Sequence, residues 1–219
     1  LLTHTSRWAQ NETVNLKYSR NTNETKLISL DLTDAYGVDF RLKVLNYFDT
    51  AMSYNLRLAN LKDLRQNLKV RSTRHQDATF QTAFDYRKFR FTPKVDYVFD
   101  IARGGLGIIT QQTELITPSL LIKADTQLPK GLKLPFIRRI FAFTNRIIWT
   151  TTLSYAMKKS PITLTDNNRL FTVNSSADYE AAKNLRLTFN AGIQRFWHKY
   201  LKEEEYISYQ GGSTLTFQF

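Results

Sequence analysis

Residues 147–157 read Ile-Ile-Trp-Thr-Thr-Thr-Leu-Ser-Tyr-Ala-Met, and their pattern is the clearest indication of the fold class. Counted from Ile147, every second residue is apolar except Thr151, while the residues between are mostly small or hydroxyl-bearing. Successive side chains of a β-strand lie on opposite faces, so a period of two predicts a strand with one apolar and one polar face. A tilted membrane strand needs about 9–11 residues, whereas strands of soluble proteins usually have about 5–6. This run has the membrane length.

The same alternation recurs along the whole chain. It predicts about twelve strands. The expected runs cover residues 14–18, 28–32, 38–44, 52–58, 68–70, 80–86, 95–101, 114–126, 147–157, 171–179, 185–193 and 209–219. Residues typical of turns punctuate them at 21–23, 34–37, 104–105 and 166–168.

The polar residues that alternate with the apolar ones in these runs help to distinguish a soluble sheet from a membrane barrel. Many are charged, among them Lys17, Arg41 and Arg57, as expected where that face meets water and not a second sheet. In a transmembrane barrel, lipid contacts the apolar face and the lumen is polar. We therefore predict an all-β fold, an antiparallel transmembrane β-barrel, in which residues 1–219 form one domain or a segment of a larger barrel. A soluble antiparallel sheet is the alternative.

Composition excludes several other classes. The chain has 219 residues, a formal charge of +12 and 13% aromatic residues, with 8 Gly, 5 Pro and no Cys. Collagen, simple disorder, disulfide frameworks and thiolate metal sites are excluded on these grounds. No apolar run exceeds about four residues, and a spanning helix needs about 20.

Aromatic side chains near the expected strand ends suit the interfaces of a membrane, where amphipathic rings lie at the depth of the lipid headgroups. The simpler interpretation is that aromatic residues favour strands in general. The residues expected at the interfaces are Tyr54, Tyr97, Trp149, Tyr155 and Trp197.

The carboxy-terminal strand ends at Phe219, with Phe217, Leu215 and Tyr209 in the same phase. This pattern resembles the terminal β-signal of bacterial outer-membrane proteins. The resemblance implies that the barrel-assembly machinery recognises these four residues, and that the chain resides in the outer membrane of a Gram-negative bacterium with lipid and lipopolysaccharide around it.

A narrower resemblance involves residues 131–136 and 143–146, which lead into the run at 147–157, and then residues 166–169 and 181–186. These segments resemble the carboxy-terminal strands of very large barrels of the SprA type, the translocon of type 9 secretion. Their general pattern is also similar to that of LptD-type lipopolysaccharide assembly barrels. The resemblance implies protein export, accessory secretion subunits and a chain that is a fragment of a larger barrel. The amino-terminal residues 1–5 show no signal-peptide pattern, which fits either a fragment or a processed chain.

Candidates for chemistry are few. The three histidines, His4, His75 and His198, have no metal-binding spacing, so we expect no metal, cofactor or catalytic residue. His75 lies near Ser72 and Asp77, which leaves a barrel-embedded lipid hydrolase as an alternative. A structural or adhesive barrel is the other alternative.

The positive charge has two interpretations. Basic clusters at 62–74, 87–90, 138–139 and 158–159 suit a cationic lumen or anionic headgroups. Nucleic acid is not expected as a partner, because the basic residues are scattered through alternating strands and no recognition motif occurs. The sequence thus predicts a non-enzymatic conduit for transport or export across the outer membrane.

Overall fold

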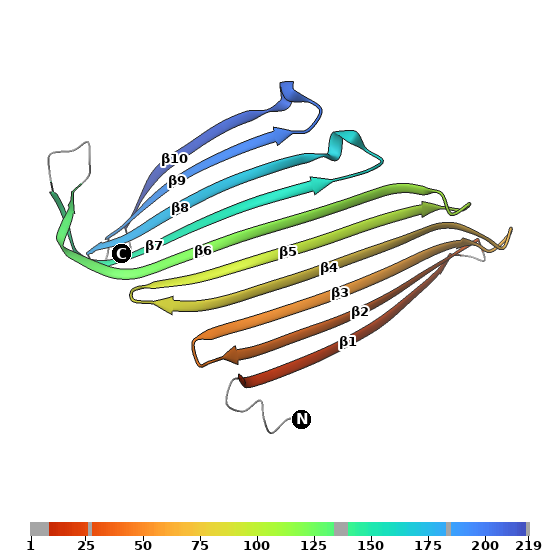
Figure 1. Cartoon of the computed structure of the whole chain (residues 1–219), viewed down its shortest axis with the longest axis horizontal. Coiled ribbons are helices and arrows are strands. Elements are labelled where there is room, and N and C mark those ends of the chain that lie inside the picture. Colours follow the sequence, from red (N-terminus) through yellow and green to blue (C-terminus); the bar gives the residue numbers. More distant parts are fainter. Residues whose placement is uncertain (1–8, 26–27, 134–139, 183–184, 218–219) are drawn as a thin grey trace.

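The chain forms one antiparallel sheet in a computed structural model that describes residues 9–25, 28–133, 140–182 and 185–217 (Figure 1). Ten strands lie side by side in sequence order from the first to the last. Their bounds are β1 (Ala9–Thr25), β2 (Ser29–Val44), β3 (Phe48–Asp63), β4 (Leu68–Tyr86), β5 (Phe89–Gly104), β6 (Ile109–Lys133), β7 (Ile140–Lys159), β8 (Asn168–Ala182), β9 (Leu185–His198) and β10 (Tyr206–Phe217). The all-β, antiparallel prediction is confirmed.

The sheet is not closed among the described residues. Strands β1 and β10 lie at opposite edges, and each pairs with a single neighbour, β2 and β9 respectively. The barrel itself therefore remains a prediction.

Helical structure in the described ranges is confined to two short turns, η2 (Leu164–Asp166) and η3 (Lys202–Glu204). No helix in this part of the chain is long and apolar enough to cross a membrane.

The two ends of the sheet differ in their connections. At one end, here called the turn end, β2 joins β3 through residues 45–47, and β4 joins β5 through residues 87–88. Leu45 and Asn46 both have positive φ, and the N–H of Tyr47 donates to the carbonyl of Val44, so this is a primed hairpin turn that matches the twist of paired strands. The opposite end, the loop end, carries residues 160–167 and 199–205 with η2 and η3.

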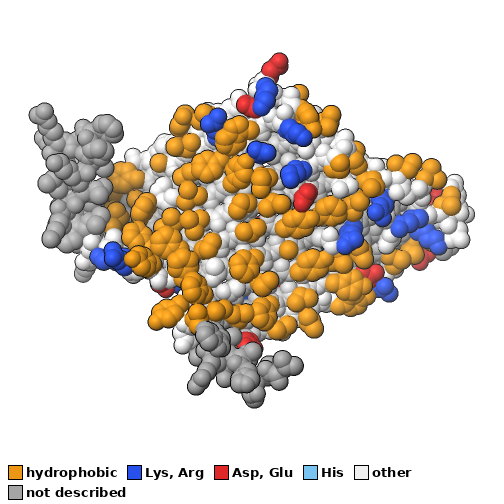
Figure 2. Space-filling view, viewed as in Figure 1, with side chains coloured by type: hydrophobic (Ala, Val, Ile, Leu, Met, Phe, Trp, Pro, Cys, Tyr) orange, Lys and Arg blue, Asp and Glu red, His pale blue; other side chains and the backbone are white. Residues whose placement is uncertain are grey.

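Strand register carries the alternation across the whole sheet. One row of partners runs Val14, Phe40, Met52, Phe80 and Val95. The adjacent row, on the opposite face, runs Asn15, Asp39, Ser53, Thr79 and Asp96. We call these two sides the apolar face and the polar face. Hydrophobic side chains cover most of the side seen in Figure 2, and Lys and Arg gather toward its loop end.

No hydrophobic core is present in the described residues. The buried apolar side chains are three alanines, Ala83, Ala102 and Ala124, while Leu16 is 77% exposed and Tyr209 73% exposed. The accessible surface is 16181 Å². A compact protein of this mass would expose about 10,400 Å². A single layer with no helix packed on it cannot bury its own apolar face.

Two strand boundaries expected from the sequence are wrong. Residues 34–37 are not a turn, because β2 continues through them with Tyr36 paired to Leu56 and Gly37 to Asn55. A Cβ on Gly37 would lie 2.8 Å from the Asn55 Oδ1 atom, so this glycine permits a close cross-strand approach and does not mark a turn.

The second wrong boundary lies in β4, which joins the expected runs at 68–70 and 80–86 into one strand. The joins in β2 and β4 reduce the expected twelve strands to the ten observed, because residues with weak alternation or turn preference lie in the middle of these long strands. A third expected connection, residues 21–23, lies inside β1 and leaves the number of strands unchanged.

Candidate functional site

The apolar face has the dimensions of a bilayer core. In β5, the positions from Phe89 to Ile101 that lie on this face are all apolar. The run Ile147 to Met157 in β7 covers ten residue steps, which is about 33 Å along the strand. Tilted by about 40°, such a run spans about 25 Å, the height of the apolar band of an outer-membrane barrel.

The polar face carries cross-strand pairs between charged side chains. The Lys17 ammonium lies 2.6 Å from Asp39, and the Arg186 guanidinium lies 2.9 Å from Asp178. The Arg146 guanidinium also pairs with Asp125. These side chains are partly exposed, so each pair contributes little to stability. Their combined effect is a hydrated surface.

Among the described residues that strand register assigns to the polar face, carboxylates and cations are present in about equal number, although the whole chain carries +12. By register, the cations of this face are Lys17, Arg41, Lys43, Arg57, Arg71, Arg90, Lys94, Lys123, Arg146, Lys158 and Arg186. The carboxylates are Asp31, Asp39, Asp49, Asp63, Asp77, Asp85, Asp96, Asp100, Asp125, Asp178 and Glu180. The excess positive charge of the protein therefore lies elsewhere.

His75 lies on the polar face between two carboxylates. Its Nδ1 atom is 2.6 Å from Asp100 and its Nε2 atom is 3.4 Å from Asp77, which also accepts a hydrogen bond from Asn55. Ser72 has the opposite phase in β4 and points to the apolar face. The structure therefore does not bring the Ser72 hydroxyl to His75.

His198, at the end of β9, is 1% exposed and forms hydrogen bonds with two loops, residues 160–167 and residues 199–205. Its Nδ1 atom accepts the backbone N–H groups of Tyr200 and Leu201, so the proton is on Nε2, which donates to the carbonyl of Thr165 at 2.9 Å. The adjacent backbone N–H of Lys199 donates to the carbonyl of Asn167. Loops 160–167 and 199–205 are thus held in a fixed relation.

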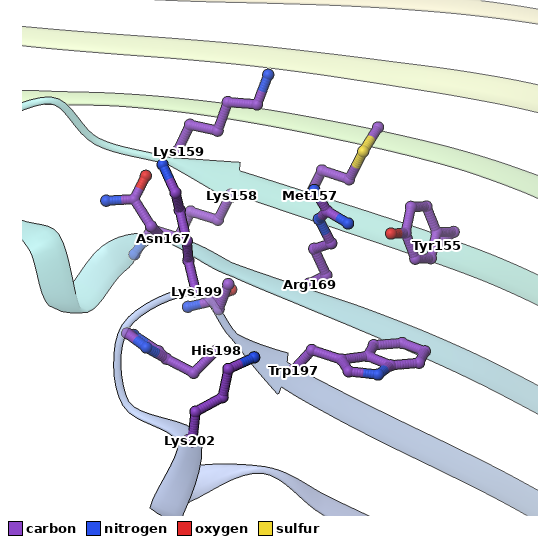
Figure 3. Close-up of a pocket in the computed structure, with 11 residues that line it drawn as sticks. Tyr155, Met157, Lys158, Lys159, Asn167, Arg169, Trp197, His198, Lys199 and Lys202 are labelled. Carbon is purple, nitrogen blue, oxygen red and sulfur yellow. The ribbon is translucent and has the colours of Figure 1, made fainter.

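A cavity of about 480 Å³ opens beside these loops, and we call it the loop-end pocket (Figure 3). Met157, Arg169 and Trp197 form one row across β7, β8 and β9. The residues lining the pocket are Tyr155, Met157, Lys158, Lys159, Asn167, Asn168, Arg169, Trp197, His198, Lys199 and Lys202. Five of these are Lys or Arg and none is acidic.

Two of the pocket cations are neutralised by nearby carboxylates. The Lys158 ammonium lies 2.8 Å from Asp166, and the Lys202 ammonium lies 2.9 Å from Glu205. The hydrogen bond from Lys202 holds the pKa of the Glu205 carboxyl below its ordinary value. Arg169, Lys159 and Lys199 form no ion pair with a carboxylate among the described residues, although Glu114 lies across from Lys159 in the neighbouring strand β6.

The five aromatic residues expected at membrane interfaces all lie on the apolar face. Tyr155 and Trp197 meet edge to face at the loop end with ring centroids 6.4 Å apart, and Trp149 donates to the Ser175 hydroxyl. Tyr54, Tyr97 and Trp149 lie in the middle of β3, β5 and β7 and not near strand ends.

The terminal pattern is partly described. Tyr209, Leu215 and Phe217 share the apolar face of β10, opposite Ile193, Leu187 and Leu185. Phe219 lies outside the described residues. Every described side chain of β10 is exposed, as on an unpaired edge.

Sequence reasoning missed the loop-end pocket. Lys158 and Lys159 are noticeable beside an apolar strand, but Arg169 joins them only through the register of β7 and β8. No group of three metal-binding side chains occurs in the described part of the chain. Comparison of the chain with protein-family models, curated proteins and solved structures gives no match.

Proposed function

We propose that this chain forms the wall, or part of the wall, of a transmembrane β-barrel in the bacterial outer membrane. The observation that supports this most is the single-layer sheet with a bilayer-sized apolar face and a hydrated polar face. Backbone groups in hydrocarbon need partners within the protein, and a closed sheet supplies them. Closure joins β1 either to β10 or to strands of another segment.

The proposed function is passage of material along the polar face, with no chemistry by the chain itself. The cargo is a solute or an exported protein, and the resemblance to SprA-type and LptD-type barrels favours a large cargo. The exposed aromatic pattern of β10 supports delivery by the barrel-assembly machinery, and lipid and lipopolysaccharide are the expected surroundings.

The balanced charge of the polar face revises the expectation of a cationic lumen. Since carboxylates offset the cations there, the proposed pore discriminates weakly between small anions and cations. A predominantly positive lumen would instead favour anions.

Planar-bilayer recordings of the purified protein test the conduit. We expect stepwise conductance with weak ion selectivity. The double substitution Asp96→Asn/Asp100→Asn is expected to shift the selectivity toward anions, because it removes two carboxylates from the polar face. Glu114→Gln, at a position on the apolar face, is the matched control and should leave selectivity unchanged. A protein that inserts but neither conducts nor releases entrapped solute would contradict the conduit and leave a structural or adhesive barrel.

A further inference from the structure

We propose that the loop-end pocket binds the phosphate-bearing headgroup of an anionic membrane lipid. This inference rests on the proposed membrane location of the sheet. It adds a specific ligand class and a specific place at the edge of the apolar band.

The pocket cations lie at the end of the apolar band. On β7 the apolar face runs from Ile147 to Met157, and the next position in the same phase is Lys159. On β8 the same face runs from Tyr179 to Phe171, and the next position is Arg169. Cations therefore replace hydrophobic side chains on one face within one step of the end of the band, at the depth where lipid headgroups lie.

Part of the positive charge of the pocket is not paired. Lys158 and Lys202 have carboxylate partners at 2.8 and 2.9 Å, whereas Arg169 and Lys159 form no ion pair among the described residues. Glu114 lies across from Lys159 in β6 without forming an ion pair with it, so Arg169 carries most of this argument. The Lys199 ammonium lies 4.9 Å from the centroid of the Tyr200 ring and likewise forms no ion pair with a carboxylate in the described part of the chain. A phosphate would supply the missing negative charge, and the planar guanidinium of Arg169 can donate two parallel hydrogen bonds to it.

The pocket also has an apolar wall. Tyr155, Met157 and Trp197 line the same cavity as the cations, as Figure 3 shows. A free inorganic anion has no apolar group to contact this surface. A lipid combines a phosphate with an acyl chain that continues along the apolar face, so the mixed lining favours a lipid.

The pocket is also preformed. His198 links the two loops through Thr165 on one side and through Tyr200 and Leu201 on the other, and it is almost fully buried. Lys159 and Arg169 stand on the paired strands β7 and β8, and Lys199 directly follows β9. A preformed site loses less conformational entropy on binding.

The test uses the full protein in micelles of an uncharged detergent, titrated by calorimetry with short-chain phosphatidylglycerol, short-chain phosphatidylcholine or inorganic phosphate. We expect saturable binding of phosphatidylglycerol that is at least about tenfold tighter than that of the other two, since each cation near a lipid surface adds to the attraction. The triple variant Lys159→Gln/Arg169→Gln/Lys199→Gln should lose this preference.

The matched control is Lys17→Gln/Lys94→Gln/Arg186→Gln, which removes the same charge from the polar face and should bind phosphatidylglycerol as the parent does. Equal binding of the two lipids, equal binding of inorganic phosphate, or unchanged binding by the pocket variant overturns the lipid site. If the protein disperses in micelles yet shows one of these results, the site fails alone. If the protein stays dispersed without detergent, the proposed membrane location fails as well.

Discussion

Arginine in place of Val95 is expected to lower the free energy of unfolding in a bilayer by about 2–4 kcal/mol. Val95 lies at the centre of the apolar run in β5, on the apolar face, with Phe80 and Pro118 as its neighbours across the two adjacent strands. Its side chain is 42% exposed, so in the proposed barrel it contacts acyl chains. A guanidinium at position 95 would lose its hydration in the hydrocarbon, and this loss is the source of the expected destabilisation. Reversible urea unfolding of the protein in phosphatidylcholine vesicles measures the change.

Val98→Arg is the matched control, because it is the same substitution three residues further along the same strand. Val98 lies on the polar face opposite Asp77, with Asp96 and Asp100 two positions away in β5. The new cation would face water and three carboxylates, so we expect a change within about 0.5 kcal/mol. Equal small effects of Val95→Arg and Val98→Arg would contradict lipid contact at Val95, since exposed positions in water tolerate such changes.

The second large expected effect is that the chain folds to a soluble, single species only in the presence of an amphiphile such as detergent. Diluted from urea into buffer, the chain is expected to aggregate, because its apolar face has no covering layer and extended exposed apolar surfaces associate. Diluted into detergent micelles, it is expected to give a β-sheet circular dichroism spectrum and a single species in light scattering. Detergent below its critical micelle concentration is the control. A monodisperse β-sheet protein in plain buffer would overturn the proposed location.

The sequence alone carries most of the fold, because alternation is a local property. The phase of Val38, Phe40 and Leu42 determines which side chains share a face without any knowledge of neighbouring strands. The positions of the connections between strands are less predictable from the sequence. Asp34 and Gly37 are typical of turns, but in β2 cross-strand pairing outweighs that local preference.

The candidate site was less predictable than the fold. The loop-end pocket depends on register between strands, which places Arg169 beside both Met157 and Trp197. The sequence gives no signal for that register, because residues 160–167 could connect the strands in several alignments. The net charge of each face likewise depends on the register between strands. A total of +12 suggested a positive lumen, and only the register shows that the polar face is nearly balanced.

A cysteine scan of β5 measures, position by position, whether one face of the sheet contacts lipid and the other contacts water. The natural chain has no cysteine, so each single substitution from Val95 to Asp100 carries one fluorophore. In bilayers, probes at Val95, Tyr97 and Phe99 are expected to be quenched by nitroxide-labelled acyl chains, and probes at Asp96, Val98 and Asp100 by an aqueous quencher. Quenching without this alternation, or equal access of the aqueous quencher to all six positions, would show that the apolar face of β5 does not contact lipid.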